Sequence, residues 1–354
     1  MKNFIKFFVV LTVSAFVLLG AVSVMASENI TVDINSMNIV VDGERVFADN
    51  FVYESTTYVP LRRIAEMLGK KVEWNADVYG AFISDAESVA VTGDSKEGVV
   101  LKKGVTIDVQ RNTMKIFVNG VEVEADNFVY SETTYVPLRK ISEMFKKEVT
   151  WEMISNTAFI GEKGISFFDG KVLGTINGIE YTDYMYEYYE SMYEDEYGYY
   201  LSVGMDADAT LGTKEEYVMK KLKNDYALID YALKNGMTMT PYYNVSYYES
   251  VKSTLKGVKG DMERFTAMLQ MQGFTSLNSY YYAMINADLF VQYSSRYVND
   301  ITEEEILDFY DKNEELKYSY DYSEARDDIV RIISHERSQK DIDEMAKQVV
   351  VEIK

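Results

Sequence analysis

Few residues of this chain could carry out nucleophilic, acid–base or metal chemistry. Its 354 residues include one His, His335, and no Cys. No Ser-His-Asp set can be built around His335, which falls in a C-terminal helical pattern where a surface or packing role is expected. Asp206-Ala207-Asp208 has part of the spacing of a calcium loop, but the Gly and the distant Glu that complete such a loop are missing. The sequence therefore predicts no catalytic residue, no cofactor and no metal site.

Tyrosine is the residue type that could instead support binding. Only five of the 30 Tyr precede residue 171. A Tyr ring is large and rigid with a polar tip, and ordering it costs little rotamer entropy, which suits a cleft for varied unfolded segments. The simpler alternative, an ordinary core between helices, accounts for most of these rings. The residues that we expect to line a peptide-binding groove are Tyr184, Tyr188, Tyr281, Tyr293 and Phe309.

The charge balance excludes some partners. The chain has 57 Asp and Glu against 36 Lys and Arg, and most of the excess lies from Lys171 onward. Phosphates of nucleic acids and anionic membrane surfaces would be repelled. Solubility in an envelope environment is the simplest reason for the acidity.

An internal repeat organises the first half of the chain. Residues 30–84 match residues 107–161 at a constant offset of 77 without a gap. Both Trp and two of the three Pro occupy matched positions. The signature residues of the repeat are Tyr58, Pro60, Arg62 and Trp74, matched by Tyr135, Pro137, Arg139 and Trp151.

Each copy of the repeat has the same predicted elements. Asp42-Gly43 and Asn119-Gly120 end short apolar runs and indicate hairpins. A strand that ends at Pro60 or Pro137 leads into a short helix, and two further strands follow. Gly69 can close the first helix in the left-handed conformation, whereas its match is Lys146, so we expect a less sharply defined end there. A small antiparallel sheet wrapped on one helix is predicted for residues 27–90 and again for 91–165.

These motifs resemble the copper amine oxidase N-terminal (stalk) domain, found as repeats in secreted proteins of Gram-positive bacteria. The resemblance covers about residues 30–161. An amine oxidase needs several His ligands for copper and a modifiable Tyr in an Asn-Tyr context, and this chain has one His and no Asn-Tyr pair. The resemblance therefore implies a non-catalytic module that presents another domain at the cell envelope, with cell-wall polymer as a further partner.

The N-terminal residues 1–26 read as a secretory signal peptide. Lys2 and Lys6 precede an apolar run, and Val24-Met25-Ala26 offers a cleavage site before Ser27. The alternative is a retained anchor, because the apolar run approaches the length that spans a bilayer. We expect a secreted, extracytoplasmic protein associated with the cell envelope and, beyond this segment, no membrane partner.

Helical patterns dominate residues 171–354. Capping boxes begin at Thr213 and Thr302, a stripe of apolar residues runs from Val218 to Leu233, and Pro241 opens another helix. The order of elements resembles the N-terminal chaperone domain of SurA/PrsA-type extracytoplasmic foldases, with a C-terminal helix that returns to pack on it. The parvulin domain that these foldases insert before the last helix is missing, so prolyl isomerase activity is not expected.

The sequence thus predicts an α+β multidomain protein, with two small β-rich repeats followed by a mostly helical domain. The expected function is non-enzymatic, chaperone-like binding of unfolded or extended polypeptides. Two alternatives stay open: a structural scaffold that binds the cell wall, and a foldase with residual prolyl isomerase activity.

Overall fold

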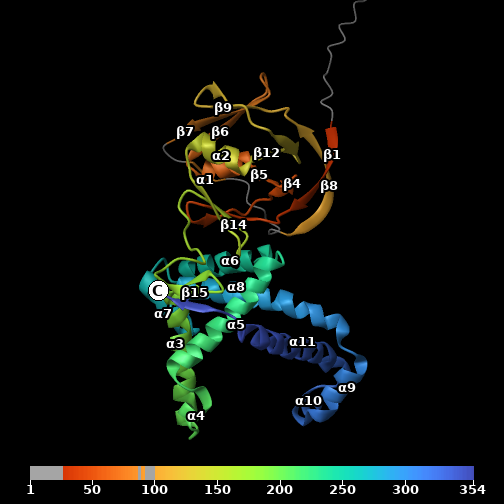
Figure 1. Ribbon diagram of the computed structural model, residues 1–354. Coiled ribbons are helices and arrows are strands. Elements are labelled where there is room, and N and C mark those ends of the chain that lie inside the picture. Colours follow the sequence, from red (N-terminus) through yellow and green to blue (C-terminus); the bar gives the residue numbers. More distant parts are fainter. Residues whose placement is uncertain (1–26, 87–88, 92–99) are drawn as a thin grey trace, which may run out of the picture.

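A computed structural model describes residues 27–86, 89–91 and 100–354. A β-rich repeat domain is followed by a helical domain, and the two are stacked one above the other in Figure 1. The predicted α+β class is therefore confirmed. The signal peptide predicted for residues 1–26 lies outside the described residues. None of the helices in the described ranges is long and apolar enough to cross a membrane.

The two copies of the repeat contain matching elements. The first copy consists of β1 (Ser27–Ile34), β2 (Asn38–Val41), β3 (Glu44–Arg45), β4 (Phe51–Tyr53), β5 (Thr56–Pro60), α1 (Leu61–Met67), β6 (Lys70–Asn75) and β7 (Gly80–Asp85). The second copy consists of β8 (Lys102–Arg111), β9 (Lys115–Val118), β10 (Val121–Glu122), β11 (Phe128–Tyr130), β12 (Thr133–Pro137), α2 (Leu138–Phe145), β13 (Val149–Glu152) and β14 (Thr157–Ile160).

Strands of both copies close a single barrel in the order β1-β4-β5-β12-β11-β8. Where the copies meet, matched residues pair with each other: Ile30 lies opposite Ile107, and Val59 opposite Val136. Residues 77 positions apart face each other only if the copies are related by a pseudo-twofold axis that passes between them. The repeat domain is therefore built like a symmetric dimer within one chain.

The copies also exchange strands outside the barrel. β7 runs parallel to β9 of the second copy, and β14 runs parallel to β2 of the first. The resulting sheets are β10-β9-β7-β6 and β13-β14-β2-β3. The expectation of a self-contained antiparallel sheet in each copy was wrong, because the central strands of both small sheets find their partners in the other copy.

One apolar core spans both copies. Leu61 and Ile64 of α1 are buried together with Leu138 and Ile141 of α2, between the sheets. The two helices begin directly after Pro60 and Pro137, as predicted. Lys146, which matches Gly69, ends α2 in the left-handed conformation with φ 54°, so the expectation of a less defined end was wrong.

The helical domain begins and ends with strands of one small sheet. Its strands are β15 (Val172–Ile176), β16 (Ile179–Thr182) and β17 (Val351–Ile353). Its helices are α3 (Asp183–Ser202), α4 (Ala207–Leu211), α5 (Lys214–Lys234), α6 (Pro241–Gly257), α7 (Met262–Met271), α8 (Leu277–Ser294), the 3₁₀ helix η1 (Ser295–Asp300), α9 (Glu303–Lys312), α10 (Glu314–Ser319) and α11 (Tyr322–Ala346). α11 packs on α5, α8 and α9, and β17 pairs with β15. The end of the chain thus returns to the start of this domain.

Gly174 permits this return. A Cβ atom at Gly174 would lie 2.2 Å from the backbone oxygen of Glu352 in β17. Only a residue without a side chain lets the last strand approach β15 so closely.

Two arms project from the helical domain on the side away from the repeat domain (Figure 1). We define the first arm as residues 193–211, the end of α3 and α4. The second arm is residues 303–333, which comprise α9, α10 and the first half of α11. A separate small core of Ile306, Ala325, Ile329 and Ile333 holds the second arm together.

A buried carboxylate lies at the junction of the two domains. Glu152 at the end of β13 accepts hydrogen bonds from Ser155 Oγ (2.5 Å), Ser166 Oγ (2.5 Å) and the backbone N–H of Phe167 (2.7 Å). Burial raises the pKa of Glu152, and the three hydrogen bonds oppose this effect. Nearby, the N–H of Met239 in the helical domain donates to the carbonyl of Ile154 at 2.8 Å. The segment that leaves the repeat domain is therefore fixed at both sides of the junction.

Candidate functional sites

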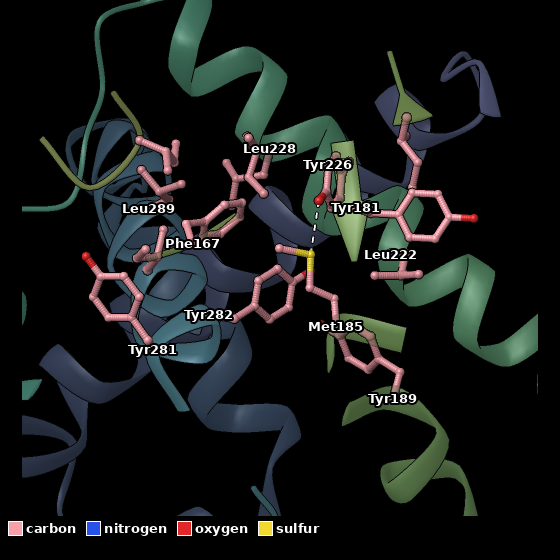
Figure 2. Packing of buried hydrophobic residues seen from close by; sticks show 14 of the residues in the cluster. Phe167, Tyr181, Met185, Tyr189, Leu222, Tyr226, Leu228, Tyr281, Tyr282 and Leu289 are labelled. Atoms are coloured by element: carbon pink, nitrogen blue, oxygen red, sulfur yellow. Dashed lines mark hydrogen bonds between the residues drawn. The ribbon is translucent and has the colours of Figure 1, made fainter. Parts of the chain in front are cut away.

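Three of the five residues predicted to line a peptide-binding groove are buried in the core of the helical domain. Tyr184, Tyr281 and Tyr293 are all buried, and Tyr281 is completely inaccessible. Figure 2 shows Tyr281 packed among the other core side chains near Leu289 and Phe167. The assignment of these three to a groove was wrong, because their rings fill the space between helices.

The other two predicted residues are partly exposed. Tyr188 stacks on Phe274 with ring centroids 6.0 Å apart. Phe309 packs against the small core of the second arm. The structure therefore does not bring the five residues together in one groove.

The core that contains Tyr184, Tyr281 and Tyr293 also contains an acidic residue. Asp225 of α5 accepts hydrogen bonds from the hydroxyl groups of Tyr189 and Tyr282, the latter at 2.6 Å. Burial raises the pKa of Asp225 to about 6, while the two tyrosine hydroxyls and Lys221 pull it down. This buried carboxylate was not predicted from the sequence, although Asp225 lies beside Tyr226, a residue of the predicted apolar stripe.

The remaining sequence candidates have structural roles. His335 is exposed, with its ring 5.1 Å from that of Phe290. Asp206 caps α4 by accepting the N–H of Ala209 at 3.0 Å. Within residues 27–86, 89–91 and 100–354, no three His, Cys, Asp or Glu side chains gather where they could hold a metal ion.

The ends of the arms expose apolar side chains. In the first arm, Tyr199, Leu201, Val203 and Met205 are each about half exposed or more, within seven consecutive residues. In the second arm, Tyr318 is 93% exposed and Tyr320 is exposed as well. Several large apolar side chains are thus accessible to another molecule at the end of each arm. We call the first set, residues 199–205, the arm-tip residues.

A groove of about 710 Å³ lies between α5 and α11. Met219 and Ala346 contribute apolar surface to it, and Asn224 donates to Asp343 across it at 2.8 Å. Lysines and glutamates of both helices surround these residues. The groove is thus open to solvent and has charges of both signs at its edges.

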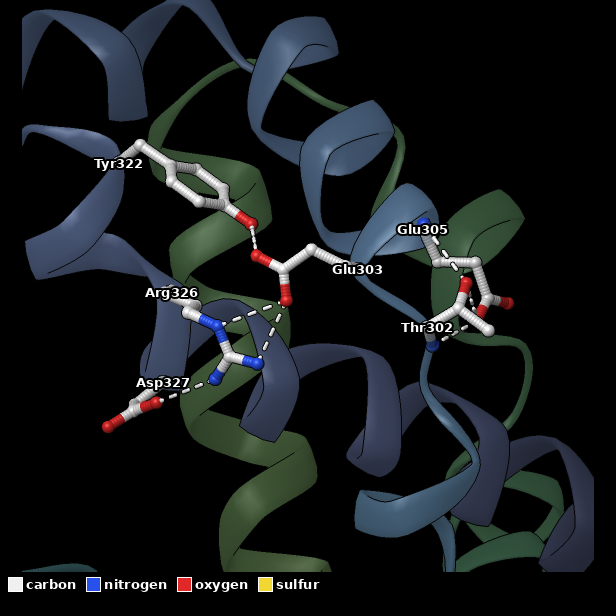
Figure 3. Close-up of polar contacts among 6 residues, drawn as sticks. All are labelled: Thr302, Glu303, Glu305, Tyr322, Arg326 and Asp327. Carbon is white, nitrogen blue, oxygen red and sulfur yellow. Dashed lines mark hydrogen bonds and ion pairs between the residues drawn. The ribbon is translucent and has the colours of Figure 1, made fainter.

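Within the second arm, α9 is attached to the first half of α11 by a charged cluster. Glu303 at the start of α9 accepts from the hydroxyl of Tyr322 and from Arg326 Nη2 at 2.9 Å (Figure 3). The hydrogen bonds from Arg326 and Tyr322 hold the pKa of Glu303 below its usual value. Thr302 and Glu305 form the predicted capping box beside it. The helices of the second arm are therefore fixed to each other by hydrogen bonds and ion pairs.

A cleft with a volume of about 1090 Å³ lies in the repeat domain. Pro60 and Arg62 of the signature lie beside it, and Trp74 and Tyr135 also line it. Trp74 is 45% exposed, and the ring of Tyr79 meets it edge to face with centroids 4.9 Å apart. Polar side chains of Asp49, Glu73, Asp108, Gln110 and Glu132 share the walls. The signature residues were expected to have a structural role only, and this cleft was not predicted from the sequence.

The matched residues in the other copy are arranged differently. Tyr58, the match of Tyr135, donates its hydroxyl to Asp126 at 2.8 Å, and Arg111 contacts the same carboxylate at 3.3 Å. Tyr135 has no hydrogen-bond partner for its hydroxyl among the described residues, and Ile34 stands at the position that matches Arg111. The pseudo-twofold axis thus relates a closed hydrogen-bonded site to an open cleft.

A family model described as the copper amine oxidase N-terminal domain matches the chain twice, over residues 20–83 and 40–160. Both matches agree with the predicted stalk-like repeats. This part of the chain is thus similar to a non-catalytic domain of those oxidases, not to their catalytic domain. No curated protein and no solved structure matches the chain.

Proposed function

We propose that this protein is a secreted, non-catalytic envelope protein whose helical domain holds extended segments of unfolded polypeptides. The repeat domain would act as a stalk that presents the helical domain. The similarity of residues 20–160 to a non-catalytic domain supports the first part of this proposal. The export-type residues 1–26 support secretion.

The exposed arm-tip residues are the observation that carries the binding role. Four apolar side chains, Tyr199, Leu201, Val203 and Met205, face solvent at the end of a helix whose buried face is already occupied by Tyr193. Leaving them in water forgoes about 25 cal/mol for each Å² that a partner would bury. An unfolded segment can cover them without a fixed sequence, because the hydrophobic effect is not directional. Met adapts its shape to varied apolar partners.

The groove between α5 and α11 offers a path for the polypeptide backbone. Met219 and Ala346 supply apolar contact there, and charged side chains surround them. An extended client would meet apolar surface flanked by solvated charge, a combination that permits weak binding of many sequences. The arm-tip residues and this groove together replace the buried tyrosines as the proposed contact surface.

The experiment measures how far the mature protein delays aggregation of a chemically denatured client, followed by light scattering. We expect the triple variant Leu201→Ser, Val203→Ser and Met205→Ser to lose most of this effect. Val121→Ser changes an exposed apolar residue of β10 in the repeat domain and is the matched control. Equal protection by the wild type and the triple variant, or none by either, would refute the proposal.

A second candidate function, attachment to a cell-wall polymer, is favoured by the cleft of the repeat domain. Pull-down with purified peptidoglycan, done separately for residues 27–165 and 166–354, distinguishes it from client binding. Retention of the first fragment alone would support wall attachment, and retention of the second alone would count against it.

A further inference from the structure

The cleft of the repeat domain contains an exposed aromatic surface held in place by the protein. Tyr79 packs its ring against Trp74 at an interplanar angle of 83°, which supports the indole from one side. Trp74 remains 45% exposed, so a large part of its apolar ring is accessible to a ligand. Such a surface costs little to order on binding, since the ring is already positioned.

Polar groups surround this surface, and two of them have no partner among the described residues. Gln110 accepts a long hydrogen bond of 3.5 Å from Tyr79, and its amide nitrogen has no partner among the described residues. The hydroxyl of Tyr135 is similarly unpaired in that part of the chain. Asp108 adds a carboxylate acceptor, and so does Glu73, which also pairs with Lys71 at 2.6 Å. Arg62 donates to the carbonyl of Val72 at 2.7 Å, pairs with Glu66 at 3.7 Å and has further N–H donors beside the cleft. The cleft therefore offers donors and acceptors beside one apolar face.

The other copy of the repeat shows what this position looks like without such a cleft. Asn156 takes the place of Tyr79 and donates to the carbonyl of Ser36. Asp33 takes the place of Gln110 and accepts the N–H of Gly104 at 2.8 Å. Trp151 is as exposed as Trp74, at 48%, but has no ring in the position of Tyr79. The unpaired amide nitrogen of Gln110 and hydroxyl of Tyr135 are thus particular to one copy and are not a consequence of the fold.

We infer that this cleft binds an uncharged glycan segment, with one sugar ring stacked on Trp74. The apolar C–H face of a pyranose fits an aromatic ring, while its hydroxyl and acetamido groups need nearby donors and acceptors. The acidic side chains Asp49, Asp108 and Glu132 around the cleft disfavour polyanions. The volume of about 1090 Å³ is at the upper end of that of ligand pockets, which span about 300–1,000 Å³, so the cleft has room for an oligosaccharide. This assignment deepens the second candidate function, attachment to a wall polymer through the same cleft, and does not rest on the client-binding role of the helical domain.

The two Trp allow a direct test on the full mature chain. Trp151→Phe leaves Trp74 as the sole indole, and its fluorescence is followed while tri-N-acetylchitotriose is added. We expect a saturable change in this signal. Trp74→Ala should weaken binding measured by calorimetry about tenfold, because ring contacts contribute about 0.5–1.5 kcal/mol beyond area burial. Trp151→Ala is the matched control and should change the affinity less than twofold.

Two further experiments identify the source of the ligand and test whether a variant is misfolded. Gln110→Ala removes a polar contact at the rim and should weaken chitotriose binding several-fold, with an unchanged circular dichroism spectrum. Retention on insoluble peptidoglycan with the same dependence on Trp74 would indicate wall glycan as the source, whereas binding of the soluble trisaccharide alone would indicate free oligosaccharide. Equal loss in both Trp variants, no binding at millimolar trisaccharide, or competition by an unfolded peptide would each overturn the inference.

Discussion

Val59 lies opposite Val136 where β5 pairs with β12, so two residues 77 positions apart meet on the pseudo-twofold axis of the barrel. The same relationship recurs at Ile30 and Ile107. Each copy therefore contributes half of every shared surface. The copies depend on each other as the subunits of an obligate dimer do.

The first prediction concerns this dependence. Residues 27–90 alone lack β9, the central partner of β7, and β12, the partner of β5. We expect this fragment to have no cooperative thermal transition as a monomer, whereas residues 27–165, which contain all strands of the three sheets, should have one. Circular dichroism melting combined with size-exclusion chromatography checks this. A monomeric 27–90 fragment that melts cooperatively would contradict the exchange of strands.

The sequence predicted the repeat and the elements but not their exchange. Asp42-Gly43 and Asn119-Gly120 form turns with positive φ, as expected from the hairpin signal. Two copies with nearly the same strands, however, offer each strand two equivalent partners, one in its own copy and one in the other. Pairing within a copy and pairing between copies satisfy the same pattern of apolar residues, so the choice depends on loop geometry and long-range packing.

In the helical domain, too, local features were predicted correctly and long-range packing was not. Pro241 and the capping boxes at Thr213 and Thr302 marked the starts of α6, α5 and α9 correctly, because these signals are local. Whether a tyrosine is buried, by contrast, depends on long-range packing: Tyr184 and Tyr281 are buried, whereas Tyr199 and Tyr318 are exposed. A Tyr has an apolar ring and a polar tip, so its type alone does not tell which surface it occupies.

The second prediction concerns the end of α2. Lys146 adopts φ 54°, a conformation that costs a residue with a Cβ about 1–2 kcal/mol relative to its preferred regions. Lys146→Gly should therefore raise the free energy of unfolding by about 1 kcal/mol, measured by urea denaturation. Gly69→Ala, at the matched position with φ 71°, is the reciprocal control and should lower it by a similar amount. An unchanged or lower stability of Lys146→Gly would mean that the lysine side chain has contacts that outweigh the strain.

The third prediction follows from Asp225, whose pKa is raised by burial from 3.8 to about 6. The folded protein binds the proton of the Asp225 carboxyl group more tightly than the unfolded chain does. The contribution of Asp225 to the free energy of unfolding is therefore largest below pH 4 and is lost as the pH rises to about 6. The loss is on the order of 3 kcal/mol, since each pKa unit corresponds to about 1.4 kcal/mol. Asp225→Asn keeps an acceptor for Tyr189 and Tyr282 and should remove this part of the pH dependence.

Chemical denaturation between pH 4 and pH 8 measures the effect of Asp225. Glu215→Gln replaces an exposed carboxylate of the same helix and should leave the pH profile unchanged. If Asp225→Asn follows the wild-type profile between pH 4 and pH 6, the buried carboxylate is not the group that titrates.

The fourth prediction concerns the junction between the domains. Glu152→Ala would leave the hydroxyls of Ser155 and Ser166 and the N–H of Phe167 without their acceptor. Each buried donor left unpaired costs about 1–3 kcal/mol, so we expect the junction to loosen and the two domains to melt in separate transitions. Differential scanning calorimetry and limited proteolysis within residues 161–171 measure this. Asn75→Ala, at the position of the first copy that matches Glu152, faces solvent and is the control. One shared transition and unchanged protease resistance in Glu152→Ala would mean that other contacts, such as Met239 to Ile154, hold the domains together without the carboxylate.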